Sequence, residues 1–405
     1  MTDTEVVIQG GGTAALATAL GLARGGLAVT LLDGAEYAGT GAGDGSAGPA
    51  LPSLLDLAGE RVLQNLGAWP RIRAQAIDTL ALEDAGSGRH LTLSASEIGE
   101  RRLGHVVEAG ALSRTLREVL DALPGTRRLP GAAVDAYTVC RRGVTVQLSD
   151  GRQLSARVLV GADGPASGLR RLAGLGWRRA GHGQEVVIAQ VRTRRAPGAT
   201  LHQRLQGDAP LTLLPSAAGE CTALWAVPRG RVQGLCEADE AAFAQRLGAA
   251  GGELLGPVEA VSSRRAATLQ RGHAERYTGQ RLALVGDAAD TGHPLGGQAV
   301  SLALLDAATL AESLLEARDA GRDPGGTGPL RRYERRRWGD RQRMQTGLDA
   351  LLWALSTQHG PLPPLRGLAL RTLDASAPLR RGCLRTLLSG GHGPDLPALA
   401  RGPRL

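Results

Sequence analysis

The first thirty residues alternate between apolar runs and a helical repeat. Residues 6–8 are a short β-branched run, and residues 13–24 are rich in Ala and Leu at helical spacing. A second apolar run, residues 27–32, ends at Asp33. A glycine-rich stretch separates the first run from the helical repeat. The pattern predicts a strand, a turn, a helix and a second strand, which together form a βαβ unit.

The pattern then changes along the chain. Residues 34–53 are dense in Gly and Pro and predict a long loop, and residues 54–66 predict a helix that stops at Gly67. Residues 79–98 and 186–227 are built from shorter, alternating segments, which are typical of antiparallel strands. These two stretches therefore interrupt an α/β pattern that resumes after each of them.

This succession predicts an α/β fold with a Rossmann-like domain made of three chain segments, an inserted antiparallel β-sheet domain and a C-terminal helical tail. A length of 405 residues is ample for such an arrangement. We expect the tail to be amphipathic, with repeated Arg and a break at residues 359–365. The boundaries that we predict are 1–78, 99–181 and 271–340 for the first domain, 79–98 and 182–270 for the inserted domain, and 341–405 for the tail.

The basic composition does not favour nucleic acid as a partner. The formal charge is +8, but all 47 basic residues are Arg, which is typical of codon bias in a GC-rich genome. Aromatic residues make up 2% of the chain, so the sequence has no aromatic platform on which bases would stack. We therefore expect a solvated basic surface and no nucleic acid.

The four cysteines are scattered, without the spacing of a disulfide framework or a zinc site. This predicts a cytoplasmic protein with no bound metal. The N-terminus has no signal-peptide pattern, and no apolar stretch approaches the ~18 residues that a membrane span needs.

The glycine turn after the first strand is the first candidate site. Gly10, Gly12 and Ala15 form a Gly-x-Gly-x-x-Ala pattern between strand and helix, and Asp33 closes the second strand. Bare backbone at a helix N-terminus favours the pyrophosphate of a dinucleotide, and Asp33 would accept hydrogen bonds from the adenosine ribose. An ordinary tight turn is the alternative, and this motif alone fits both NAD and FAD.

Two further turns distinguish FAD from NAD. "GADGPASGLR" (161–170) places Asp163 after a strand, and "GDAADTGHPLGGQ" (286–298) places Gly286 and Asp287 after another. The three motifs in this order resemble the FAD-dependent aromatic hydroxylases related to 4-hydroxybenzoate hydroxylase, and most closely the ubiquinone-biosynthesis hydroxylases. Further segments also resemble that subfamily, so the likeness covers nearly the whole chain: "HGQEVVIAQV" (182–191), "HQRLQGDAPLTLLP" (202–215), "LRRYERRRWGDR" (330–341) and "GLDALLWAL" (347–355).

The resemblance assigns roles to the third motif. Asp287 would bond the ribityl hydroxyls of FAD, while Gly297 and Gln298 would open a helix, continued by Ala299, whose positive end faces the flavin pyrimidine ring. His293 and Pro294 match the family's His-Pro pair beside the reacting edge, so we take them as catalytic candidates. A loop histidine that satisfies backbone groups is the alternative for His293.

The activity implied by the resemblance is hydroxylation of the aromatic ring of a polyprenylphenol intermediate in ubiquinone biosynthesis. FAD would activate dioxygen as a C4a-hydroperoxide, with NAD(P)H or another electron donor as co-substrate. The apolar substrate implies peripheral contact with the inner membrane, and other ubiquinone-biosynthesis proteins are expected partners. A nicotinamide dehydrogenase would leave the Gly286-Asp287 loop unexplained.

Several positions depart from the family pattern. The departures are Ala299 for Gly, Ser301 for Asn, Asp290 for His or a similar residue, Gly110 for Arg, and the lack of any Arg between Asp33 and Arg61. Such changes raise an alternative function. In it, a degenerate, non-catalytic member of the family serves as a scaffold or lipid-binding partner of a ubiquinone-biosynthesis complex.

Overall fold

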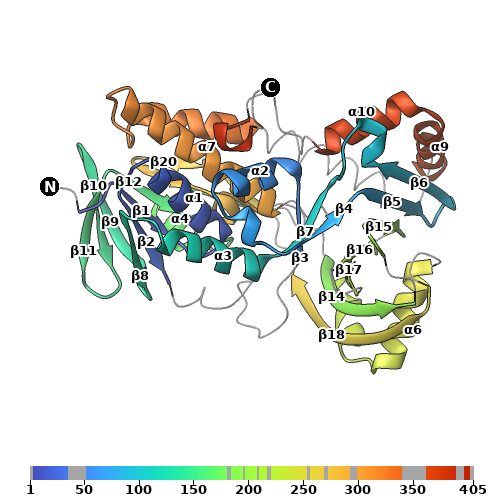
Figure 1. The fold of residues 1–405 in the computed structure, drawn as a ribbon. Coiled ribbons are helices and arrows are strands. Elements are labelled where there is room, and N and C mark those ends of the chain that lie inside the picture. Colours follow the sequence, from blue (N-terminus) through green and yellow to red (C-terminus); the bar gives the residue numbers. More distant parts are fainter. Residues whose placement is uncertain are drawn as a thin grey trace.

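A six-stranded sheet forms one side of the molecule (Figure 1). The computed structural model describes residues 3–34, 52–179, 184–194, 197–207, 209–216, 220–252, 256–268, 272–291, 299–339, 362–388 and 396–401. The strand order is β20 (Thr278–Gly279), β21 (Leu282–Leu284), β12 (Val158–Gly161), β1 (Val6–Gln9), β2 (Val29–Asp33) and β8 (Thr126–Pro130). All neighbours are parallel except β20 and β21. The central strands are buried on both faces, as expected for a parallel sheet.

Helices cover this sheet. Helix α1 (Thr13–Arg24) connects β1 to β2, which confirms the predicted βαβ unit. Helix α1 packs against α3 (Ala109–Asp121) and α7 (Ala299–Asp319), and α7 also packs against α2 (Leu57–Asn65). Helix α7 is buried over 15 of its 21 residues, because it lies between the sheet's helical layer and a following helix at 327–339.

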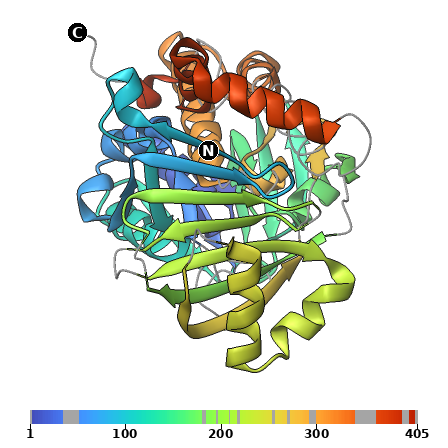
Figure 2. The same ribbon diagram turned by 90° about the vertical axis from the view of Figure 1, so that its right-hand side faces the viewer.

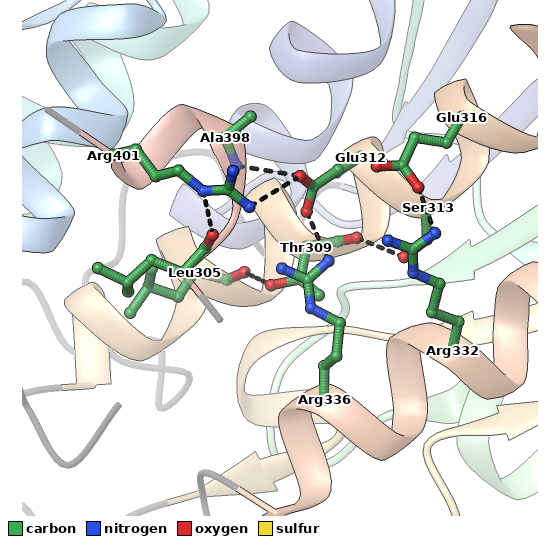
Figure 3. Close-up of polar contacts among 10 residues, drawn as sticks. Leu305, Thr309, Glu312, Ser313, Glu316, Arg332, Arg336, Ala398 and Arg401 are labelled. Carbon is green, nitrogen blue, oxygen red and sulfur yellow. Dashed lines mark hydrogen bonds and ion pairs between the residues drawn. The ribbon is translucent and has the colours of Figure 1, made fainter. Parts of the chain in front are cut away.

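Charged pairs hold that following helix and the C-terminal turn against α7 (Figure 3). Glu312 accepts a hydrogen bond from Arg336 at 2.5 Å, and Glu316 pairs with Arg332. The turn η7 (Ala398–Ala400) joins the same network, because the Ala398 amide donates to Glu312 and the Arg401 guanidinium lies 3.8 Å from it. The outer side of α7 is therefore fixed by charge, and its inner side by apolar packing.

A second, seven-stranded sheet is assembled from two distant chain segments. Its order is β18 (Val258–Thr268), β14 (Gln184–Thr193), β17 (Cys221–Pro228), β16 (Leu211–Pro215), β15 (Thr200–Leu205), β5 (Thr79–Asp84) and β6 (Arg89–Ser94). All pairs are antiparallel except β15 and β5, which are parallel where the two segments meet. One face packs on α5 (Arg229–Cys236) and α6 (Glu240–Gly251). This inserted sheet and the six-stranded sheet confirm the predicted fold class.

A three-stranded sheet lies between the two large sheets (Figure 1). Its order is β3 (Pro52–Leu55), β7 (Gly104–Glu108) and β4 (Ala74–Ile77). The helix predicted from residue 54 begins only at Leu57, because Leu54 and Leu55 pair with β7 in an extended conformation. Asp56 then caps α2, with its Oδ1 accepting from the Gly59 amide at 2.7 Å.

The remaining elements are smaller. Strands β9 (Val134–Cys140), β10 (Gly143–Leu148) and β11 (Gln153–Ala156) form one sheet, and β13 (Trp177–Arg179), β19 (Gly272–Ala274) and β22 (Asp290–Thr291) form another. Short helices follow at η2 (Trp69–Arg71), η3 (Ala95–Ile98), α4 (Gly168–Leu172) and η5 (Gly286–Ala288).

The C-terminal region contains α9 (Leu362–Ala375) and α10 (Ala377–Leu388). The predicted helix break at residues 359–365 was wrong for residues 362–365, because α9 begins at Leu362 and accommodates Pro363 and Pro364 in its first turn. Helix N-terminal amides need no partner within the helix, so proline costs little there. No helix in the described part of the chain is long and apolar enough to cross a membrane.

Candidate cofactor site and active site

The glycine turn after β1 leaves the N-terminus of α1 open. Gly10 has φ +135°, and a Cβ there would lie 2.2 Å from the carbonyl oxygen of Ala162, so only glycine fits. A Cβ on Gly12 would meet no atom within 4 Å. Helix α1 has no side-chain cap and no acid in its first turn, and Ala15 of this helix is fully buried. Unpaired amides with open space above them suit a pyrophosphate.

Asp33 lies at the end of β2, buried beside two arginines. Nε of Arg117 is 3.5 Å, and Nη2 of Arg128 is 3.7 Å, from Oδ2 of Asp33. Arg117 Nη2 also donates to the Gly11 carbonyl oxygen at 3.3 Å, which links the acid to the glycine turn. Both cations approach Oδ2, and no donor from the described residues reaches Oδ1. The sequence did not reveal these contacts, because α3 and β8 are remote from Asp33 along the chain.

Asp163 joins the loop after β12 to the end of β1. Its carboxylate accepts hydrogen bonds from Gln9 Nε2 at 2.9 Å, Ser167 Oγ at 2.5 Å and the Leu169 amide at 3.1 Å. Ser167 in turn caps α4. Asp163 follows Ala162, whose carbonyl faces Gly10. In this geometry the side chain positions the loop beside the glycine turn.

The third turn follows β21 and is fixed from three sides. Gly286 has φ +60°, and a Cβ there would lie 2.7 Å from the Ala14 Cβ on α1. Its amide donates to Asp306 Oδ2 on α7 at 2.9 Å. Asp306 also pairs with Arg337 Nε at 2.6 Å, and both side chains are buried. A buried ion pair, which is costly to break, therefore holds the start of this loop.

Asp287 is half-buried in that loop. Within the described part of the loop, residues 286–291, Thr291 is also half-buried and the other four residues are buried. The following carbonyl, of Ala288, accepts from the buried Arg170 guanidinium at 2.9 Å. Arg170 also stacks on Trp177, 3.9 Å from the ring centre, and burial lowers the pKa of its guanidinium. Arg170 of the second motif thus supports the third.

These turns lie at one edge of the six-stranded sheet. Strands β21, β12, β1 and β2 are consecutive neighbours and parallel, so their carboxyl ends meet on the same side. Ligands of open α/β sheets bind at this edge. The first two predicted motifs, the described residues 286–291 of the third motif and Asp33 therefore lie along one edge of the sheet, and the open helix terminus and separated carboxylates there suit a dinucleotide such as FAD.

Three residues that depart from the family pattern, Ser301, Asp290 and Ala299, lie in the described part of the chain, where their burial can be compared. Ser301 is buried, and its Oγ accepts from the Asp56 amide at 2.9 Å. Asp290 is buried and accepts from the Tyr277 hydroxyl at 2.8 Å. Ala299 is exposed at the first residue of α7. Ser301 and Asp290 thus have structural partners, whereas the Ala299 methyl group faces solvent.

The predicted catalytic pair lies outside the described residues. His293 and Pro294, together with Gly297 and Gln298, fall in the segment 292–298. Their assignment stays a prediction.

A buried polar cluster on the three-stranded sheet was missed by sequence reasoning. His105 on β7 places Nδ1 3.4 Å from Glu60 Oε2 and Nε2 3.1 Å from an Arg102 nitrogen, with its ring against the edge of Trp69. Burial, reinforced by the Arg102 cation, lowers the pKa of His105 to about 4. Burial also raises the pKa of Glu60. A single His in an apolar strand gave no signal for this cluster.

No group of three or more metal-ligating side chains occurs among the described residues.

Residues 3–344 match the family model described as "FAD binding domain". The chain is 33% identical to ubiquinone hydroxylase UbiL of Rhodospirillum rubrum, over 98% of this chain and 92% of that one. It is 31% identical to 3-demethoxyubiquinol 3-hydroxylase of Escherichia coli, over 95% and 98%. The fold matches p-nitrophenol 4-monooxygenase PnpA of Pseudomonas putida with a TM-score of 0.78, at 20% identity over 97% and 99% of the two chains.

Proposed function

The chain belongs to the FAD binding domain family and is related over nearly its whole length to ubiquinone-biosynthesis hydroxylases, and from this premise we propose that it hydroxylates the aromatic ring of a polyprenylphenol. The observation that carries the proposal is the convergence of three turns and Asp33 at one sheet edge. An FAD-dependent monooxygenase needs such an elongated site. The relatives named as ubiquinone hydroxylases supply the substrate class.

Each part of the site has a proposed role in binding FAD. The open amides around Gly12 would bind the pyrophosphate, and Oδ1 of Asp33 would accept from the adenosine ribose. Asp287 would bond the ribityl hydroxyls, since it is half-buried and follows the carboxyl end of β21. Asp163 would act by holding its loop against β1. When bound, FAD supplies the redox chemistry that activates dioxygen for transfer to the ring.

Helix α7 would contribute electrostatically. Its first turn contains no acidic residue, so the positive end of a 21-residue helix is not neutralised by its own side chains. A negative charge on a nearby ring system is stabilised by such a terminus. The predicted Gly297 and Gln298, with Ala299, would bring the ring close to that terminus.

An apolar core joins the inserted sheet to the three-stranded sheet. In it Val186, Ile188 and Leu224 are buried against Ile77 and Val106. We propose that the prenylated ring binds beside this apolar core, between the domains whose boundaries are predicted above, where water is kept from it.

Oxygen incorporation tests the proposal. The FAD-loaded protein, given NADH or NADPH and a short-chain prenylphenol under ¹⁸O₂, should yield a hydroxylated product that carries one ¹⁸O atom by mass spectrometry. The Asp287→Ala variant is the matched control and should lose product in proportion to its lost FAD. A protein that binds FAD and oxidises the reductant without labelling any prenylphenol tested would contradict the proposal.

A further inference from the structure

Helix α7 begins with two turns that contain a single polar side chain. Residues 299–305 are apolar except for Ser301, which is fully buried. Figures 1 and 2 show α7 (orange) and α6 (yellow) far apart in both views, so the helices that cover the inserted sheet lie away from this end of α7. Helix α7 packs instead on elements that include α1, α2 and β3. The surroundings of Ser301 therefore belong to the domain that carries the glycine turns.

The Ser301 hydroxyl joins the first turn of α7 to the start of α2. Its Oγ accepts a hydrogen bond from the backbone amide of Asp56 at 2.9 Å. Asp56 lies between β3 and α2, and its Oδ1 accepts from the Gly59 amide at 2.7 Å. A Cβ on Gly59 would lie 3.2 Å from Ser301 Oγ, so the glycine lets α2 approach α7 closely at this point. We call Ser301 Oγ, the Asp56 amide and Gly59 the α2–α7 junction.

Two other buried hydroxyls of α7 bond within their own helix (Figure 3). Thr309 Oγ1 donates to the Leu305 carbonyl oxygen at 2.7 Å, and Ser313 Oγ donates to the Thr309 carbonyl oxygen at 2.8 Å. This pattern is common for Ser and Thr inside helices and does not tie the helix to anything else. Ser301 differs, because its partner lies on another element of the fold. Its bond therefore fixes the position of the first turn of α7.

We propose that Ser301 is a positioning residue for FAD, and that it influences the reduction equilibrium of the bound flavin by fixing the first turn of α7. The field of a helix terminus acts mainly within its first turn, so a small displacement of that turn changes how well it stabilises a nearby negative charge. Reduction increases the negative charge on the flavin pyrimidine ring. The inference rests on the function proposed above, which places this ring at the start of α7. Ser301 is buried and acts through the backbone of the turn.

Three variants of the full-length, FAD-loaded protein test this role. Ser301→Ala removes the acceptor of the Asp56 amide. Gly59→Ala keeps Ser301 but places a methyl group against its Oγ, and alanine favours the helix more than glycine does. Ser313→Ala is the matched control, because it removes a buried hydroxyl from the same helix whose bond stays inside that helix.

The measurement is the equilibrium between oxidised and reduced bound FAD against a reference dye, read by absorbance without oxygen, with the FAD affinity and melting temperature of each variant alongside. We expect the equilibrium to move at least threefold toward oxidised FAD in Ser301→Ala and in Gly59→Ala, and to keep the parent value in Ser313→Ala. The FAD affinity of the two junction variants should fall in parallel.

Two outcomes would overturn the role of Ser301. In one, Ser301→Ala lowers the melting temperature but leaves the reduction equilibrium unchanged, as a purely structural hydroxyl would. In the other, Ser313→Ala shifts the equilibrium as much as the junction variants do. If Ser301→Ala does not retain FAD, Gly59→Ala decides the question, and an unchanged equilibrium in that variant rejects the role.

Failure of this inference and failure of the proposed reaction are distinguishable. A shifted equilibrium in the junction variants, from a parent that labels no prenylphenol, would keep the role of Ser301 and reject the reaction. A parent that gives ¹⁸O-labelled product, with an equilibrium that neither junction variant changes, would keep the reaction and reject the role of Ser301.

Discussion

Acid should weaken the fold at the three-stranded sheet, because His105 is buried there as a neutral base. Its pKa falls from 6.5 to about 4 through burial, with the Arg102 cation adding to the effect. In the unfolded chain the imidazole binds a proton below about pH 6.5, whereas in the folded protein it stays neutral until about pH 4. The unfolded state therefore binds more protons in this window, and stability falls as the pH is lowered through it.

The size of the effect follows from the shift. A difference of about 2.5 pKa units corresponds to about 3 kcal/mol when fully expressed, and to about 2.5 kcal/mol at pH 4.5. Glu60 acts in the opposite direction. Burial raises its pKa above 4.5, so the folded state holds the extra proton, and stability falls as the pH rises through that range. The pH dependence of wild-type stability is thus the difference between the contributions of His105 and Glu60.

Removing Glu60 isolates the histidine. Urea unfolding of Glu60→Gln should lose about 2.5 kcal/mol more between pH 7 and pH 4.5 than unfolding of Glu60→Gln/His105→Gln, since glutamine keeps an acceptor for Arg102 without titrating. Chemical-shift titration of the His105 ring gives its pKa directly. Parallel stability curves for the two proteins, or a measured pKa near 6.5, would refute the reasoning.

Three further predictions concern the cofactor site. Asp287→Ala should weaken FAD binding about tenfold or more, and by more than Asp33→Ala; equal affinities in titrations of the two apo-variants would contradict the proposed placement of the ribityl chain. Arg117→Gln should weaken FAD binding by roughly 1 kcal/mol and reduce the salt dependence of the FAD affinity, because Arg117 links Asp33 to the glycine turn. An unchanged salt dependence in fluorescence titrations would argue against this role of Arg117. Ala299→Gly should increase the affinity for FAD or speed flavin reduction in stopped-flow measurements. No change in either quantity would mean that the methyl group of the exposed Ala299 does not obstruct the flavin.

Local signals were enough to predict the elements that place the site. The unit β1–α1–β2 was predictable because its apolar pattern, glycine turn and closing acid are contiguous. The turns at Asp163 and Gly286 were predictable for the same reason, since each directly follows a buried strand. Their meeting at one edge follows from parallel pairing, which the α/β succession implies.

Contacts between distant segments were not predictable in this way. Leu54 and Leu55 have helical neighbours and become extended only because β7, some fifty residues later, pairs with them. The support of the Ala288 carbonyl by Arg170 joins segments more than a hundred residues apart. Such pairings depend on tertiary packing, which no local pattern of the sequence encodes.

The departures from the family pattern bear on whether the chain has kept its chemistry. Ser301 and Asp290 each have a partner on another element, Asp56 and Tyr277, so both changes are accommodated by the fold. Gly110 is followed two turns later on α3 by Arg117, which lies on the same side of the helix and contacts the Gly11 carbonyl. A cation is therefore retained beside the glycine turn. Ala299 is the described departure without such a partner. The substitution Ala299→Gly therefore best separates a functioning flavin site from a scaffold. Removing the methyl group can improve FAD binding only in a protein that holds the flavin ring against α7.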